Sequence, residues 1–206
     1  MIRWVLIAVL LGAAGCKGSA KPSCDPAQPP SREWAYAEYL AQGGKTFEQG
    51  GLRINTRESY KGLSDLVHQA GPHGDSSFLG TVWKCKLYRD ARQLAKALLL
   101  EEGWLAANAP MRHTLATKIY GEMITRPLVA ANKDWDPTQE FTAPEVKTLP
   151  DTGVRLVHWY AHFVDVIHHD GSATPAFTRE EVVIGPDGTI GESKKLASYK
   201  RSERVN

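Results

Sequence analysis

The chain lacks the motifs that identify the best-known enzyme classes. It has no glycine-rich phosphate loop, no G-x-S-x-G nucleophile turn, no H-E-x-x-H helix and no paired C-x-x-C. These absences do not exclude an enzyme, but they leave no motif-based evidence for one. We therefore favour a binding role over catalysis and expect no cofactor.

The sequence also lacks an excess of charge of either sign. Its 206 residues include 25 Lys and Arg against 23 Asp and Glu. A nucleic-acid-binding protein would need a basic field, so this balance argues against a nucleic-acid partner. An apolar content of 42% is ordinary for a globular protein of this length, which suits one domain.

A long hydrophobic run is missing as well. The apolar stretch at residues 4–11 follows the positive charge of Arg3 and leads into small residues. It falls well short of the ~20 apolar residues that a membrane-spanning helix needs. The pattern predicts a secretory signal peptide over residues 1–15.

The sequence Ala13-Ala14-Gly15-Cys16 resembles the lipobox of bacterial lipoproteins, although alanine replaces the usual leucine three residues before the cysteine. The resemblance implies cleavage before Cys16 and acylation of that cysteine, which would anchor the protein in a membrane. Lys17 is similar to the sorting signal of lipoproteins that pass to the outer membrane, facing the periplasm. The alternative is an ordinary signal peptide followed by a chance cysteine.

Cysteine is scarce, and only Cys24 and Cys85 remain beside Cys16. An exported compartment permits disulfides, and an even pair left after lipidation favours a Cys24–Cys85 bond. Such a bond would fasten the N-terminal tether to the domain. Two free thiols are the alternative.

The composition divides the chain into four parts. The predicted signal peptide is followed by a polar, proline-rich tether over residues 16–30, a single domain over 31–198, and a basic tail over 199–206. The whole stretch 194–206 carries several Lys and Arg residues, and we expect it to be loosely ordered.

Capping residues and apolar spacing predict four helices. Ser31 starts a short helix that Gly43 and Gly44 end, and Asp90 opens another that stops at Gly103. The other two are expected over residues 55–70, which begin with a capping-box-like Asn-x-x-Glu, and from Pro110 to a stop at Pro127.

Strands are expected mainly in the second half. The longest β-type stretch, residues 153–170, is the candidate central strand, and its length predicts a bend or bulge. Shorter strands are expected at 145–149 and 178–184, with an edge strand at 81–87. The turn at 185–188, Gly-Pro-Asp-Gly, should lead into a return strand from Thr189.

Together these elements predict an α+β fold, with a helical N-terminal half packed on a curved antiparallel sheet formed mainly by the C-terminal half. In outline this arrangement resembles the cystatin-like and NTF2-like folds, in which a bent sheet wraps a helix. The resemblance rests on architecture and implies nothing about chemistry.

One polar window interrupts the candidate central strand. His158, Tyr160 and His162 share one face, whereas Trp159 and Phe163 belong to an unbroken apolar row on the other. We expect the helices to cover the tryptophan face and leave the histidine face open to solvent, as a weak ligand-binding candidate. The two histidines would lie about 13 Å apart, too far to share a metal ion without a third element, so no metal is assigned.

Two classes of function remain open. The favoured one is a non-catalytic envelope lipoprotein that binds an envelope protein, a cell-wall component or a small ligand. The other is a small hydrolase or isomerase that uses His158 or His162 as a general base, for which a carboxylate or hydroxyl partner is needed. No residue can be assigned a catalytic role from the sequence.

Overall fold

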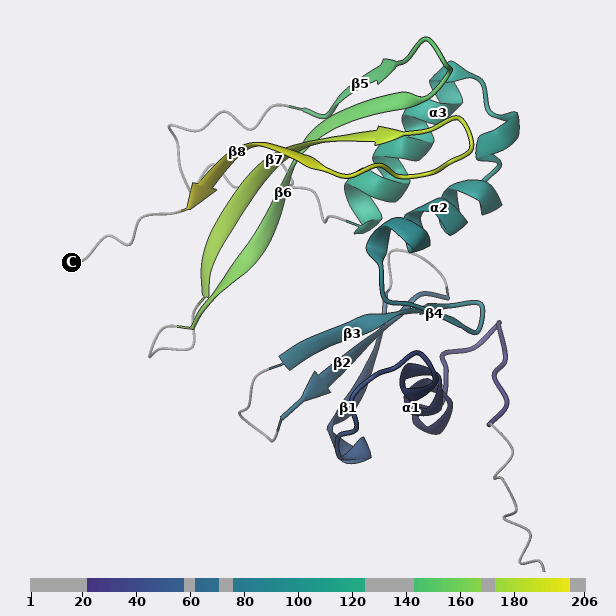
Figure 1. Ribbon diagram of the computed structural model, residues 1–206, viewed down its shortest axis with the longest axis vertical. Coiled ribbons are helices and arrows are strands. Elements are labelled where there is room, and N and C mark those ends of the chain that lie inside the picture. Colours follow the sequence, from purple (N-terminus) through teal and green to yellow (C-terminus); the bar gives the residue numbers. More distant parts are fainter. Residues whose placement is uncertain (1–21, 58–61, 71–75, 125–142, 168–172, 201–206) are drawn as a thin grey trace, which may run out of the picture.

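The computed structural model describes residues 22–57, 62–70, 76–124, 143–167 and 173–200. Within these ranges the fold is α+β, with three α-helices and two antiparallel sheets of four strands each (Figure 1). The helices alternate with strands along the chain. The predicted division into a helical half and a β half is therefore wrong.

The first sheet has the strand order β1-β2-β3-β4 and lies against α1 (Arg32–Ala41). Its strands are β1 (Leu52–Thr56), β2 (Ser64–Gln69), β3 (Ser76–Trp83) and β4 (Lys86–Tyr88). As predicted, Ser31 caps α1 by accepting a hydrogen bond from the Trp34 amide, and Gly43 is left-handed after it. Each strand gives one buried apolar side chain to a core under α1, namely Leu52, Leu66, Val82 and Leu87.

The prediction of a helix over residues 55–70 is wrong, because this stretch contains the end of β1 and all of β2. The apolar spacing fits a helix, but Gly62 has a φ of 89° and the Arg57 amide bonds to the Leu63 carbonyl across the hairpin. A left-handed residue reverses the chain where a helix would have to continue. Asp65 then accepts hydrogen bonds from Arg57 and from Thr81 of β3.

The single edge strand predicted at residues 81–87 is a hairpin instead. β3 ends at Trp83, which pairs with Lys86 of β4, and the two residues between them have positive φ, 45° for Lys84 and 58° for Cys85. Two left-handed residues are the geometry of the tight hairpin turn that matches strand twist. The predicted bond from Cys85 to Cys24 is confirmed, with the two Cα atoms 5.8 Å apart.

The two later helices follow the prediction closely. Asp90 caps α2 (Ala91–Glu101), and Gly103 follows it with a φ of 88°. Asn108 caps α3 (Ala109–Leu115), which continues as the π-helical segment η3 (Ala116–Ile124). Pro127, the predicted stop, lies outside the described residues.

The second sheet has the strand order β5-β6-β7-β8. It contains β5 (Glu145–Thr148), β6 (Val154–Ile167), β7 (Ala173–Ile184) and β8 (Lys194–Lys200). β6 is the predicted long inner strand, and its register with β7 shifts between Phe163 and Ile167, which confirms the expected irregularity. The predicted turn at 185–188 is present, with the Gly188 amide bonded to the Gly185 carbonyl.

The end of the chain differs from the prediction in two ways. After the turn, Ile190 makes only an isolated bridge to Ile184, so no return strand starts at Thr189. The stretch expected to be loosely ordered instead forms β8, which pairs with β7 as the edge of the sheet. β8 reaches Lys200, two residues past the predicted domain end.

A second core lies between α2, α3 and η3 on one side and the second sheet on the other. We call α1 and the first sheet the first lobe, and the later helices with the second sheet the second lobe. The second core also contains residues from the first lobe, namely Leu63, Trp83 and Tyr88, so the two lobes share this core where they meet. Neither sheet curls around a helix, and the curved-sheet expectation is therefore wrong. Among the described residues, no helix has the length and apolarity needed to cross a bilayer.

Candidate functional site

The polar window predicted on the central strand lies on β6, on the face that the helices cover. Its neighbours Val154 and Leu156 belong to the second core, and His158 follows them on the same face. His158 is only 2% exposed, so the expectation of an open histidine face is wrong at this position. Tyr160 is half-buried, and the side chain of His162 lies outside the described residues.

His158 is buried because β7 provides a partner for it. The strand register places Glu180 directly opposite, with His158 Nε2 at 3.0 Å from Glu180 Oε1. The two side chains are 1% and 5% exposed. A buried imidazole and a buried carboxylate each need a hydrogen-bond partner, and this pairing supplies one to both.

Tyr120 of η3 completes the buried cluster. It hydrogen-bonds to Glu180, and its ring lies 5.8 Å from that of His158 in an edge-on arrangement. Burial, together with the negative charge of Glu180, raises the pKa of the Tyr120 phenol well above its ordinary value. The phenol therefore stays protonated and acts as a donor to the carboxylate.

Tyr160 lies one step further along the same face. Its ring is 6.0 Å from His158, and it pairs across the strands with Thr178, to which it also hydrogen-bonds. Desolvation raises the pKa of Tyr160. The helix-facing side of β6 is thus apolar at Leu156, holds a buried hydrogen-bonded imidazole at His158, and ends in a half-buried phenol at Tyr160.

The π-helical segment η3 places Tyr120 in this cluster. A π-helix of nine residues is long, because most occur as single turns, and such segments are frequent at functional sites. The next residue, Gly121, lies close to the sheet, since a Cβ there would meet the Leu156 side chain at 3.9 Å. The wider turn of η3 therefore lies directly on β6, with Tyr120 directed at Glu180.

Chemically, the cluster contains the elements of an oriented base. A carboxylate hydrogen-bonded to an imidazole fixes the orientation of the ring. A general base must also reach its substrate, however, and both groups are almost fully enclosed. The two open hollows described below have other linings.

The opposite face of the second sheet carries ion pairs. Arg155 Nε lies 2.6 Å from Glu181 Oε2, and Arg179 Nη2 lies 2.5 Å from Glu145 Oε1, a pair that spans β6. The strand register places Glu145 and Glu181 on either side of Val157, which is only 2% exposed. Trp159, predicted to be core on this face, is half-buried, and the side chain of Phe163 is outside the described residues.

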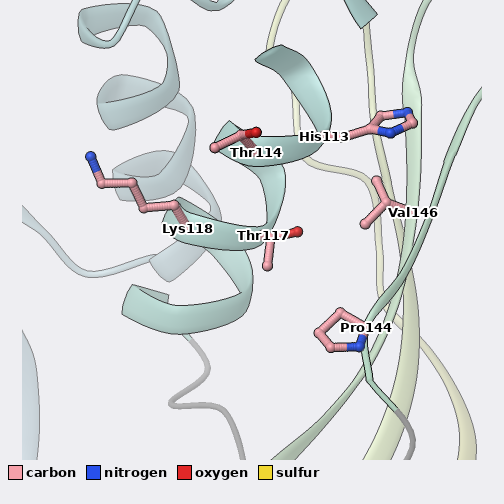
Figure 2. A pocket seen from close by; sticks show the side chains of 6 residues that line it. All are labelled: His113, Thr114, Thr117, Lys118, Pro144 and Val146. Atoms are coloured by element: carbon pink, nitrogen blue, oxygen red, sulfur yellow. The ribbon is translucent and has the colours of Figure 1, made fainter. Parts of the chain in front are cut away.

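An open groove of about 540 Å³ lies between the helix α3–η3 and the edge strand β5. We call it the α3–β5 groove, and its lining residues are His113, Thr114, Thr117, Lys118, Pro144 and Val146. Figure 2 shows His113 and Thr117 directed from the helix toward the strand, with Lys118 pointing away. His113 Nε2 lies 2.9 Å from Thr148 Oγ1 and so joins the helix to β5.

A second hollow, of about 470 Å³, lies at the edge of the first sheet. Its lining includes Gly51, Arg53 and His68. The His68 ring stacks against Phe47 with centroids 4.2 Å apart, and a Cβ on Gly51 would come within 3.0 Å of the imidazole. The hollow is therefore closed on one side by tightly packed side chains.

Neither hollow has the composition of a metal site. Among the described residues, no group of three or more His, Cys, Asp or Glu side chains converges on a point that could hold a metal ion.

No model of a known protein family matches the chain, and neither a curated protein nor a solved structure shows significant similarity to it. Arguments about function therefore depend on the residues themselves.

Two members of the buried cluster, Tyr120 and Glu180, were not predicted from the sequence. Glu180 becomes significant only through strand register, which places it opposite His158. Tyr120 follows Ile119, which is fully buried, within the helix predicted to begin at Pro110. His113, in the α3–β5 groove, carries no local signal that separates it from a surface histidine.

Proposed function

We propose that this protein is a lipid-anchored protein of the bacterial envelope whose described domain binds a partner and does not catalyse a reaction. The observation that carries the proposal is the closed state of the His158–Glu180 pair, whose side chains are 1% and 5% exposed. The α3–β5 groove is open by contrast. The groove thus offers a partner an accessible surface lined by polar side chains, whereas the candidate base, His158, is enclosed.

The anchoring half of the proposal rests on the sequence around Cys16. Support from the structure is indirect and comes from the Cys24–Cys85 disulfide, which suits an oxidising compartment outside the cytoplasm. We assign the protein to the outer membrane, facing the periplasm, because Lys17 follows the acylated position. The substitution Cys16→Ser should leave an unprocessed precursor or release the protein from the membrane.

The partner that best suits the groove is an extended segment of another envelope protein. The α3–β5 groove borders β5, which is the edge strand of its sheet, so the outer backbone groups of β5 have no strand partner among the described residues. Extended peptides bind such edges through main-chain hydrogen bonds. The imidazole of His113 and the hydroxyls of Thr114 and Thr117 would then contact alternate side chains of the peptide.

Site-specific photo-crosslinking in intact cells tests this proposal. A photoreactive residue at Thr117, in the groove, should capture a discrete partner, whereas the same residue at the exposed Ser193 should not. Replacing Thr114 with arginine should fill the groove and remove the adduct formed from position 117. An identical adduct pattern from positions 117 and 193 would show that the groove has no specific occupant.

A second candidate function is supported by one specific observation. The His158–Glu180–Tyr120 cluster takes its tyrosine from the π-helical segment η3 and so combines an oriented imidazole with a backbone irregularity that is frequent at functional sites. A small hydrolase or isomerase would need this cluster to open. Turnover of an ester or peptide substrate that is lost in a folded Glu180→Gln variant would favour this alternative over the binding role.

A further inference from the structure

The Cys24–Cys85 disulfide attaches the N-terminal segment to the tip of the β3–β4 hairpin. Cys85 is the second residue of the two-residue turn, so the attachment point is the outermost part of the hairpin. Cys16 precedes Cys24 by eight residues. Eight extended residues span at most about 30 Å, which limits how far the hairpin can lie from an acyl anchor on Cys16.

Without the disulfide, this limit would be much looser. The next fixed point along the chain is the start of α1 at Arg32, sixteen residues after Cys16. Sixteen extended residues span up to about 55 Å, nearly twice as far. The disulfide therefore determines which part of the protein surface stays near the membrane.

The surface around the disulfide is basic. Lys84 and Lys86 flank Cys85 and are both exposed, and Arg89 is exposed just after β4. Lys84 pairs with Glu101, but within the described part of the chain neither Lys86 nor Arg89 forms an ion pair. Their positions are fixed by aromatic rings, with Lys86 Nζ 5.0 Å from the centre of the Tyr88 ring and Arg89 Cζ 5.4 Å from that of Tyr39.

We propose that the β3–β4 hairpin is a membrane-facing surface, in which Lys84, Lys86 and Arg89 contact the anionic headgroups of the bilayer that carries the Cys16 anchor. This inference rests on the proposed lipid anchor and extends it to the orientation of the domain. Each basic residue at an anionic surface contributes modestly. A modest attraction is sufficient here, because the tether already holds the hairpin at high effective concentration beside the headgroups.

Figure 1 shows the hairpin beside α2, where the two halves of the molecule meet, while β8 lies on the other side of the molecule. A membrane that faces the hairpin would therefore lie away from β8, which contains Lys195.

Amine labelling of the full-length lipidated protein on vesicles tests the inference. Vesicles of phosphatidylcholine alone are compared with vesicles that also contain phosphatidylglycerol, and acetylation by a water-soluble reagent is followed at each lysine by mass spectrometry. Lys84 and Lys86 should react about fivefold more slowly on the anionic vesicles, whereas Lys195 of β8 should react equally on both. High salt should abolish the difference, because it screens the attraction.

Two variants strengthen the test. Lys86→Glu should reduce the protection of Lys84, and Lys195→Glu is the matched control that should leave it unchanged. If the wild-type protein floats with both kinds of vesicle but its hairpin lysines react equally on them, the membrane-facing hairpin is refuted while the anchor stands. If the protein floats with neither, the anchor itself is refuted and the inference fails with it.

Discussion

Removing the His158 side chain tests whether this histidine is buried, as the structure shows, and not open to solvent, as the sequence predicted. The substitution His158→Ala would leave Glu180, whose side chain is 5% exposed, with its carboxylate buried and with one partner fewer. Removing one partner of a buried hydrogen bond costs about 1–3 kcal/mol, and more when the remaining group is charged, since that group keeps its desolvation penalty. The cavity left by the imidazole adds to that cost.

His113→Ala is the matched control. Its imidazole also makes one hydrogen bond, to Thr148, but it is part of an open groove where water can replace it. The control should cost under about 1 kcal/mol. Urea unfolding of the two variants and the wild type, followed by far-ultraviolet circular dichroism, measures both values. Equal losses of stability in the two variants would mean that His158 is not buried against Glu180.

Three further predictions concern the rest of the chain. Replacing Cys24 and Cys85 with serine should lower the free energy of unfolding by about 4 kcal/mol, because the bond closes a loop of 61 residues, and an intact mass unchanged by reduction would refute the disulfide. Tyr120 has a raised pKa, so stability should be complete below pH 10.0 and fall above it, where the unfolded chain ionises first. Tyr120→Phe should flatten that alkaline decline, and an unchanged slope would contradict the assignment. Gly80→Ala should be destabilising, since a Cβ there would meet the Tyr88 carbonyl oxygen at 2.7 Å, whereas Gly50→Ala, with open space around it, should be tolerated; equal melting temperatures would contradict this.

The helices that the sequence predicted correctly are those with strong local signals. Asp90 and Gly103 delimit α2 through a side-chain cap and a left-handed residue, both of which depend only on neighbouring residues. The same holds for Ser31 and Gly43 at the ends of α1. Local physics determines these boundaries, and local sequence therefore reveals them.

The β1–β2 hairpin of the first sheet was missed because it has apolar residues at helical spacing. Leu63 and Leu66 are both fully buried, but they point into different cores, one shared with the second lobe and one under α1. A helix was inferred because periodicity cannot tell two separate cores from one continuous face. The left-handed glycine at position 62 was the available signal against a helix.

The candidate site was only half predictable for a related reason. The polar window at His158 and Tyr160 could be read from the alternation of the strand, but its exposure depended on a partner from β7. Register is a tertiary property, and it alone brings Glu180 opposite His158. Without that partner, burying a histidine is unfavourable, which is why the sequence favoured an open face.

Histidine footprinting tests the central claim, that the His158 cluster is a closed structural element in a binding domain. Diethyl pyrocarbonate is applied to the folded protein, and modification of each histidine is followed by mass spectrometry. We predict that His68 and His113, which line open hollows, react readily, and that His158 reacts only when the protein unfolds. Modification of His158 at the rate of His113 in the folded protein would contradict the account and favour an accessible catalytic pocket.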